Sequence, residues 1–337
     1  MDARRCSRWA GLSLLCLASA SAFAAEPLHL EELGEGPVPI PGIGNAELSG
    51  ITWMGGARYL AVDDGRSRLF PLEVSLDEAS GKITRVVAGE FVSLKGARDI
   101  EGIAWWPESG SVLVTDEIAH EIREYDPASG ALKRAIPAPP PFRGRIRENR
   151  GFEGVAIGAE GKSVWTANEG PLRLDGGEAG ALEGAWIRIQ RLDASLRATG
   201  QWAYRTEPGL GFVGVVDLMV APGGELLVLE RALTGGGFSA RIFAVDLSRA
   251  TDISAFDKLR NRDDFWPARK EKLWERAGGF QNFEGLALGP ELPGGGHLVL
   301  LVSDGGGQRQ PTLLALRLTA GNPGPSTTPP KQGRPAR

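Results

Sequence analysis

Short apolar runs separated by turn residues recur along this chain. Within 99–126, an apolar run at 100–106 precedes the turn Pro-Glu-Ser-Gly, a β-branched run at 111–115 and an alternating run at 122–125. Runs of this length and composition, bounded by Gly, Pro, Asp and Ser, are typical of β-strands. The segment therefore predicts three consecutive strands joined by short connections.

The same three-strand pattern occurs four more times, with copies that begin near residues 48, 152, 216 and 283. Gly50, Gly102 and Gly154 are spaced 52 residues apart, and insertions lengthen the later intervals. Repeats of about 40 to 50 residues that hold several strands indicate the blades of a β-propeller. We expect an all-β propeller of five four-stranded blades, or six if residues 251–279 hold a degenerate blade.

The fourth, outer strand of each blade is expected to follow its repeat, at 82–94, 131–137, 196–205 and 272–276. The last repeat ends at 312–318 without such a strand, while a lone strand-like run at 28–35 precedes the first repeat. Closing a propeller removes the free sheet edges. The N-terminal strand is therefore expected to complete the last blade. Residues 251–279 are expected to be partly helical and partly loop.

The two ends of the chain differ from the repeats. Residues 1–25 combine three arginines, a short apolar run and the sequence Ala-Phe-Ala, which is typical of a secretory signal peptide. We expect cleavage after Ala24 or Ala25, a propeller domain at 26–319 and a disordered Pro-, Gly- and Thr-rich tail at 320–337. The mature protein is expected to be periplasmic or secreted, without a membrane span, and monomeric.

Composition narrows the chemistry. Both cysteines, Cys6 and Cys16, lie within the signal peptide, so the mature chain has no disulfide, thiol nucleophile or Cys-zinc site. Removing residues 1–25 changes the formal charge from −4 to −6, which argues against nucleic-acid binding. Neither a G-x-S-x-G elbow nor an H-E-x-x-H or dinucleotide-binding motif is found, and no organic cofactor is expected. Of the three histidines, only His120 lies near an expected channel mouth.

Acidic residues mark one end of the expected blades. In a blade the innermost strand lines the channel and the second runs antiparallel to it, so the first strand's start and the second strand's end share one mouth. The first-strand set is Asp99, Glu101, Glu153, Asp217 and Glu284. The second-strand set is Asp63, Asp64, Asp116, Glu117, Glu169, Glu230 and Asp304. Arg98, Arg150 and Arg231 accompany them.

Such a ring of carboxylates needs compensation, because like charges raise one another's pKa. Oxygen-rich clusters without Cys suit hard cations such as Ca²⁺ or Mg²⁺. We expect Glu101, Glu153, Glu284 and Arg231 to be catalytic. We expect Asp63, Asp64, Asp116, Glu169, Asp217, Glu230 and Asp304 to hold metal. The structural alternative is that these acids cap turns and bind backbone between blades. Gly102, Gly154 and Gly285 are expected to let neighbouring strands approach closely.

A combination of motifs resembles a known family. They are Ser49-Gly50-Ile51, the run 99–104, Phe152–Ala156 with Asn168-Glu169-Gly170-Pro171, Leu229–Arg231, and the run 282–288 with Val302–Asp304. Together they look like the phytase-like family, labelled "esterase-like activity of phytase", over residues 47–318. The resemblance implies a secreted β-propeller and suggests calcium-dependent hydrolysis of phosphate esters.

Two functions remain open from the sequence. The first is a metal-dependent hydrolase of a phosphate ester or another ester, in which acidic residues hold metal and Arg231, or Arg98, holds phosphate. The second is a non-catalytic periplasmic propeller that binds another molecule. Propellers host both kinds of function. What separates the two is whether the carboxylates converge beside a basic partner.

Overall fold

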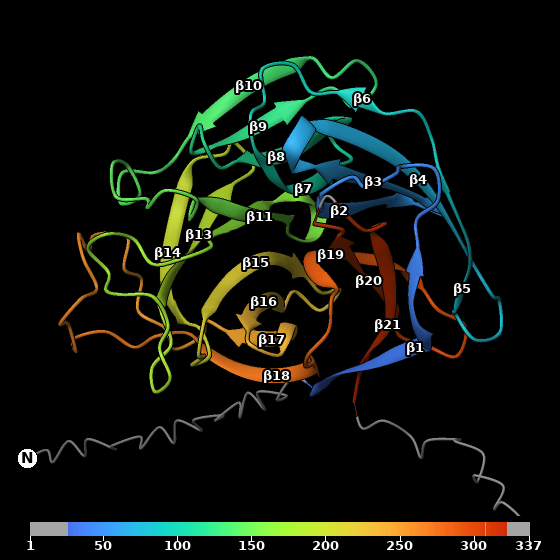
Figure 1. The fold of residues 1–337 in the computed structure, drawn as a ribbon. Coiled ribbons are helices and arrows are strands. Elements are labelled where there is room, and N and C mark those ends of the chain that lie inside the picture. Colours follow the sequence, from blue (N-terminus) through green and yellow to red (C-terminus); the bar gives the residue numbers. More distant parts are fainter. Residues whose placement is uncertain (1–25, 307, 322–337) are drawn as a thin grey trace, which may run out of the picture.

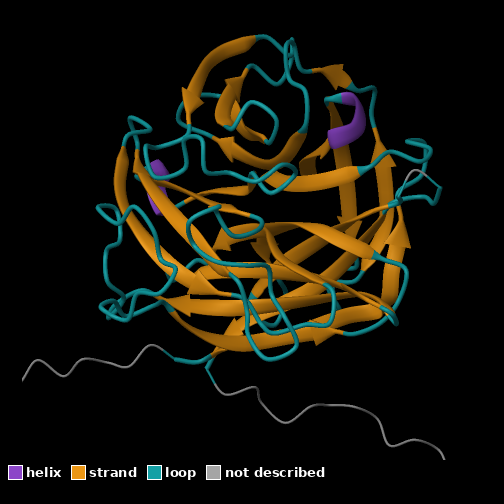
Figure 2. Cartoon of the chain, turned by 60° about the vertical axis from the view of Figure 1, so that its left-hand side comes forward, coloured by secondary structure: helices purple, strands orange, loops and turns teal. Residues whose placement is uncertain are grey.

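A computed structural model describes residues 26–306 and 308–321. The expected signal peptide at 1–25 and residues 322–337 of the expected tail lie outside this part. Strands dominate, and the only helical segments of the described residues are two 3-10 turns, η1 (Asp64–Arg66) and η2 (Ala159–Gly161) (Figure 2). No helix in the described ranges is long and apolar enough to span a membrane.

The strands form five antiparallel sheets arranged as the blades of a propeller (Figure 1). Strands are given from the innermost outward. Blade one consists of β2 (Leu48–Gly55), β3 (Arg58–Asp63), β4 (Arg68–Leu76) and β5 (Ile83–Ala88), and blade two of β7 (Ile100–Trp106), β8 (Ser111–Asp116), β9 (Glu121–Tyr125) and β10 (Leu132–Pro137). Blade three consists of β11 (Phe152–Ile157), β12 (Ser163–Asn168), β13 (Trp186–Asp193) and β14 (Ala198–Arg205). The last two blades are β15 (Phe212–Val220), β16 (Leu226–Thr234), β17 (Gly237–Asp246) and β18 (Arg269–Arg276); and β19 (Asn282–Glu291), β20 (His297–Asp304), β21 (Thr312–Ala320) and β1 (Leu28–Pro39). The first outer strand is split, because β6 (Val92–Ser93) also pairs with β4.

The N-terminal strand closes the ring, as the sequence predicted. β1 pairs antiparallel with β21, from Leu28 opposite Ala320 to Pro39 opposite Thr312. Figure 1 shows the blue strand β1 beside the red strand β21. Glu32 of β1 also accepts hydrogen bonds from Trp274 Nε1 at 3.1 Å and Arg276 Nη1 at 2.7 Å, both on β18 of the preceding blade. Closure therefore joins the first and last strands and ties them to the fourth blade.

Residues 251–279 do not form a sixth blade. They contain no helix among the described residues, and their one strand, β18, is longer than the expected 272–276. The loop before β18 instead runs along the outer edge of the third blade beside β14 (Figure 1), where Ile253 N and Ala268 N donate to Gln201 O and Ala203 O at 2.8 Å. An exposed strand edge is a site for unwanted pairing. The insertion covers that edge, which explains its mixture of buried apolar and polar residues.

The hydrophobic core is divided among the blade interfaces. Five clusters of buried side chains each join residues of two adjacent blades, and the cluster with Leu48, Ile51, Leu300 and Leu313 joins the last blade to the first. Innermost and second strands have apolar side chains on both faces because both faces are covered. Burial of this surface at about 25 cal/mol per Å² is the main stabilising contribution.

Glycines allow the innermost strands to approach one another near the axis. A Cβ added to Gly102 would lie 2.7 Å from Gly154 Cα, and one on Gly285 would lie 2.9 Å from Gly50 Cα. Such separations are too short for two non-bonded carbons. The close approach expected at Gly102, Gly154 and Gly285 is confirmed, and it keeps the channel narrow.

Each innermost strand also has a β-bulge near its start. In all five blades one extra residue separates consecutive register pairs with the second strand, as between Ile100–Asp116 and Ile103–Val114. A bulge re-aims side chains and is common beside functional sites. In each blade, the residue directly after the last paired residue before the bulge is the first residue of the bulge. These residues are Ser49, Glu101, Glu153, Val216 and Glu284. Three of the five bulges thus carry a glutamate.

Candidate functional site

The bulges bring acidic side chains to one mouth of the channel. The start of each innermost strand lies opposite the end of the second strand, as the pairs Phe152–Asn168 and Asn282–Asp304 show. Two groups of three carboxylates form there: Asp64, Asp99 and Glu101, and Glu117, Glu153 and Glu169. Within each group, one oxygen from every member lies within 4.8 Å of the others. We call them the first and second carboxylate triplets.

The first triplet joins blades one and two. Asp64 begins the 3-10 turn after β3, Asp99 directly precedes β7, and Glu101 lies in the β7 bulge. Burial raises the pKa of Asp64 to about 7 and the pKa of Asp99 to about 6, and neighbouring carboxylates add to both shifts. Burial and then the charges of Asp64 and Asp99 raise the pKa of Glu101 as well. These three groups resist ionisation together.

The second triplet joins blades two and three. Glu117 follows β8 and accepts a 2.7 Å hydrogen bond from Gly151 N, while Glu169 follows β12 and pairs with Arg150 at 3.0 Å and Arg231 at 2.8 Å. Glu153 is only 7% exposed, and within the described ranges no donor reaches its carboxylate. Burial, followed by the charges of Glu169, Glu101 and Glu117, raises its pKa far above the usual value. Glu153 is therefore a buried acid without a protein partner.

A basic group borders the second triplet. Arg231, on β16, donates to Glu169 Oε1 at 2.8 Å, to Asn282 Oδ1 at 3.2 Å and to Glu284. The guanidinium of Arg231 lies 5.5 Å from the ring centre of Phe212, and that of Arg150 lies 4.2 Å from it. Phe212 thus fixes both cations beside the carboxylates through cation–π contacts.

Glu284 and Asp304 lie on the same side of the mouth as Arg231 and are joined by the side-chain amide of Asn282. Asn282 Nδ2 donates to Glu284 Oε1 at 2.8 Å and to Asp304 Oδ2 at 3.3 Å. Glu284 therefore faces Arg231 and Asn282 and belongs to neither triplet. Asn282 lies within one of the family motifs, but no pattern in the sequence predicted a role for it or for Phe212. The register of β19 and β20 is what places Asn282 opposite Asp304.

Two of the expected metal ligands bind protein groups beside the mouth. Asp63 pairs with Arg68 and accepts a 3.3 Å bond from Glu47 N. Asp116 accepts from Arg98 N at 3.1 Å and Ala119 N at 2.8 Å, and it pairs with Arg123 at 3.0 Å. Both carboxylates end a second strand and hold the loop that follows. Neither belongs to a triplet among the described residues.

Asp217 and Glu230 lie apart from the triplets for different reasons. The bulge places Val216, and not Asp217, at the position of Glu101 and Glu153, so the sequence alignment of Asp217 with those glutamates is wrong by one residue. Asp217 replaces the axial glycine and accepts bonds from Leu286 N at 2.6 Å and Leu218 N at 2.8 Å. Glu230, on β16 of the fourth blade, accepts from Tyr204 Oη of the third blade at 2.6 Å and from Lys270 Nζ of its own blade at 2.6 Å.

The donor set of the triplets fits a hard divalent cation. All six groups offer carboxylate oxygens, and in the described chain only Glu169 among them has an arginine partner. Ca²⁺ takes six to eight oxygen ligands, and Mg²⁺ takes oxygen ligands as well. The side chains that would hold a cation are Asp64, Asp99, Glu101, Glu117, Glu153 and Glu169. Of the seven expected ligands, Asp64 and Glu169 are among them, and Glu101 and Glu153 were expected to be catalytic.

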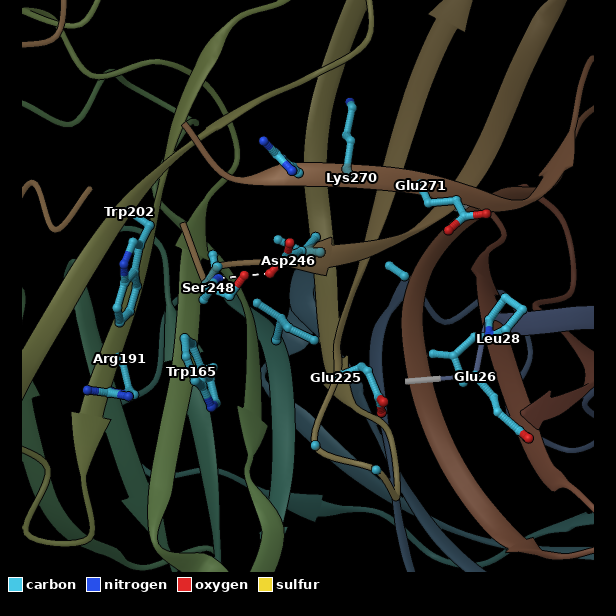
Figure 3. A pocket seen from close by; sticks show the side chains of 18 residues that line it. Glu26, Leu28, Trp165, Arg191, Trp202, Glu225, Asp246, Ser248, Lys270 and Glu271 are labelled. Carbon is cyan, nitrogen blue, oxygen red and sulfur yellow. Dashed lines mark hydrogen bonds between the residues drawn. The ribbon is translucent and has the colours of Figure 1, made fainter. Parts of the chain in front are cut away.

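A large cavity lies at the opposite end of the blades. It has a volume of about 800 Å³ and is lined by the start of β1, the β15–β16 turn and residues of blade three. Trp165 and Trp202 lie side by side there with ring centres 5.7 Å apart, and Arg191 contacts both rings (Figure 3). The axial channel itself holds about 150 Å³ and is lined mainly by apolar residues of the innermost strands. Neither cavity includes a triplet residue.

The fold and the acidic mouth define the class of protein. The chain is a five-bladed β-propeller with paired acidic clusters at one channel mouth. It belongs to the phytase-like family, described as esterase-like activity of phytase, whose pattern matches residues 43–305. The family resemblance inferred from the sequence is confirmed. No curated protein matches the chain.

Several solved structures are similar at low identity. The periplasmic gluconolactonase of Pseudomonas aeruginosa is 14% identical with a TM-score of 0.40, and the match covers 87% of this chain and 99% of that one. The PQQ-bound aldose sugar dehydrogenase of Streptomyces coelicolor is 13% identical with a TM-score of 0.43, covering 88% and 100%. The hydrazine synthase of Kuenenia stuttgartiensis is 12% identical with a TM-score of 0.37, and this chain covers 78% of its own length and 58% of that protein.

Proposed function

We propose that this protein is an exported hydrolase of phosphate esters that uses a divalent cation, with Ca²⁺ as the first candidate, at the acidic mouth. One observation carries the proposal. Glu153 is 7% exposed, has no donor among the described residues, and lies within 4.8 Å of oxygens from Glu117 and Glu169. Burying an unpaired charge costs several kcal/mol. A bound cation would remove that cost.

The family supports the reaction class. Its description names an esterase-like activity of phytase, and we carry over to this chain the phosphate-ester hydrolysis that the resemblance suggests. The basic, apolar segment at 1–25 supports export. A cation held by the triplets would polarise the phosphoryl group and lower the pKa of a bound water.

The chain's own residues would orient the substrate. The Arg150 side chain is 26% exposed, its Nη1 pairs with Glu169 at 3.0 Å and its Nε lies 3.8 Å from Glu178. Its Nη2 makes no hydrogen bond to a described residue and would be available to a phosphate oxygen. Arg231 is held by Glu169, Glu284 and Asn282. Because these bonds fix the guanidinium before substrate arrives, Arg231 is pre-organised beside the phosphate position. Burial and the neighbouring carboxylates raise the pKa of Glu153, which favours its protonated form when no cation is present.

The test combines calorimetry with turnover. Unfolding of residues 26–337 is measured in Ca²⁺ and in EDTA, together with phosphate release from 4-nitrophenyl phosphate and acid release from 4-nitrophenyl acetate. We expect a higher melting temperature in Ca²⁺. We also expect phosphate release to fall by about 100-fold or more in Glu153→Gln. Replacing the groups that merely support metal ligands already lowers metal affinity or activity by about 10- to 100-fold, and Glu153 would be a ligand itself.

The control is Asp246→Asn, which changes an exposed carboxylate at the opposite face. This variant should keep both the calcium shift and the turnover. A calcium shift without turnover of either ester would leave a cation-binding propeller that is not a hydrolase. No calcium shift and no turnover would contradict the proposal and assign the triplets to structure.

A further inference from the structure

Exposed apolar side chains gather on the loops beside the basic side of the mouth. Leu182, Leu210, Leu233 and Phe280 are 91%, 81%, 45% and 72% exposed. They come from the loop after β12, the segment before β15, the end of β16 and the segment before β19, all at the end of the blades that carries the triplets. We call these four residues the apolar crescent. Large apolar side chains in such positions mark interaction surfaces when they are contiguous.

Backbone contacts show that the loops of the crescent adjoin one another. Gly209 N donates to Gly180 O at 3.0 Å, which joins the Leu182 loop to the Leu210 segment. Phe238 N donates to Gly279 O at 3.0 Å, which joins the β16–β17 hairpin to the Phe280 segment. The segments that carry the crescent therefore follow one another from blade three to blade five.

The crescent continues into the candidate site through one residue. Phe212 pairs in register with Leu233, and its ring contacts the guanidinium groups of both Arg150 and Arg231. The two arginines in turn bind Glu169 of the second triplet. A molecule whose phosphate lies beside these arginines would thus have its organic part over an apolar surface.

Charge restricts how many phosphates that molecule carries. Eight carboxylates lie at the mouth: the six of the two triplets, together with Glu284 and Asp304. Arg150 and Arg231 are already paired with some of these carboxylates. One or two divalent cations would leave the mouth close to neutral or still acidic. A polyphosphorylated sugar alcohol would gain no apolar contact there and would be repelled, because like charges at close range are unfavourable.

We propose that the preferred substrates are phosphate monoesters of apolar alcohols, with the hydrocarbon part bound on the apolar crescent. This inference rests on the proposed hydrolase function. A buried methylene contributes about 0.8 kcal/mol, so KM is expected to fall by about fourfold for each methylene that the crescent covers. The opposite face has no part in this binding.

The test is a chain-length series from ethyl to octyl phosphate, with inositol hexakisphosphate as the polyanionic comparison, assayed by phosphate release in Ca²⁺. We expect KM to fall with chain length and inositol hexakisphosphate to be the poorest substrate. In the double variant Leu182→Ser/Leu210→Ser, KM should depend less on chain length, and KM for octyl phosphate should rise by about tenfold or more because two apolar contacts are lost. Leu132→Ser, which changes an exposed leucine at the opposite end of β10, should leave the series unchanged.

Binding is measured separately by calorimetric titration with octyl phosphate, so that the two proposals fail in different ways. Binding that weakens in the double variant without any hydrolysis would support the crescent and contradict the hydrolase. Hydrolysis with no dependence on chain length would contradict the crescent alone. Two further results would overturn the substrate inference. Co-sedimentation with phosphatidylcholine vesicles that the double variant loses would assign the crescent to a membrane. A dimer in sedimentation velocity that the double variant loses would assign it to contact with a second copy.

Discussion

Arg231 Nη2 lies 2.8 Å from Glu169 Oε1, and the same guanidinium also binds Glu284. Glu169 follows the second strand of blade three, while Glu284 lies in the bulge of blade five. Arg231 of blade four therefore links the two blades on either side of its own. These ion pairs form part of the mouth and also contribute to the stability of the propeller.

Replacing Arg231 should destabilise the protein more than a typical surface ion pair would. In Arg231→Gln, Glu284 loses the one arginine that pairs with it in the described part of the chain, and Glu169 keeps its pairing with Arg150. Breaking such a pair in a largely buried setting costs about 3 kcal/mol. Denaturant unfolding in EDTA measures the change. The control is Arg241→Gln, whose pairing with Glu275 is more exposed and should contribute less than about 1 kcal/mol. Equal effects of the two variants would contradict the linking role.

The first triplet predicts how stability depends on pH without a cation. Burial raises the pKa of Asp64 from 3.8 to about 7 and that of Asp99 from 3.8 to about 6. Because both groups bind protons more tightly in the folded state, their stabilising contribution is present below about pH 4 and is lost as the pH rises towards 7.

Melting temperatures between pH 4 and 8 in EDTA measure this loss. Asp64→Asn should reduce it, since an amide does not ionise, and Ca²⁺ should oppose it in the unmodified protein by favouring the charged forms. Asp77→Asn serves as the control, because the pKa of the exposed Asp77 is lowered by hydrogen bonds from Ser80. A pH dependence that is unchanged in Asp64→Asn would contradict the burial of that charge.

The axial glycines predict a steric effect. In Gly154→Ala the added methyl would lie 2.7 Å from Asp217 Cα, where neither backbone can move without separating blades three and four. Overpacking of this kind costs about 1 to 3 kcal/mol, and backbone crowding places Gly154→Ala at the upper end. Gly177→Ala, with no atom within 4 Å of the new methyl, should be close to neutral. Thermal unfolding of both variants tests this, and a neutral Gly154→Ala would contradict the close approach.

A buried ion pair outside the mouth should be independent of cations. Asp175 and Arg188 have fully buried side chains, with oxygen–nitrogen distances of 2.6 and 2.9 Å, and Asp175 also accepts a 2.8 Å bond from Leu259 N in the insertion. Asp175→Ala should lower the free energy of unfolding by about 3 to 5 kcal/mol. The loss should be the same in Ca²⁺ and in EDTA. A loss that Ca²⁺ reverses would place Asp175 in a cation site.

The sequence determined the architecture of this protein. Five repeats of apolar strands, the glycines at fixed spacing and the lone strand at the start predicted a closed five-bladed propeller, and the family motifs were recognisable in the same repeats. These features are local: strand periodicity and turn residues depend on near neighbours in the chain. The sixth blade left open for residues 251–279 is absent from the described chain, because that segment packs against the edge of β14.

Only the tertiary structure decided which acidic residues meet. The bulges shift each strand by one residue, so Glu101 and Glu153 lie in the triplets while Asp217 occupies the axial glycine position. Asp63 and Asp116 look like Asp64 and Glu117 in the sequence, yet their carboxylates bind backbone and arginine groups. A one-residue change of register turns a side chain to another side of its strand. Strand pairing therefore selected the carboxylates of the candidate site.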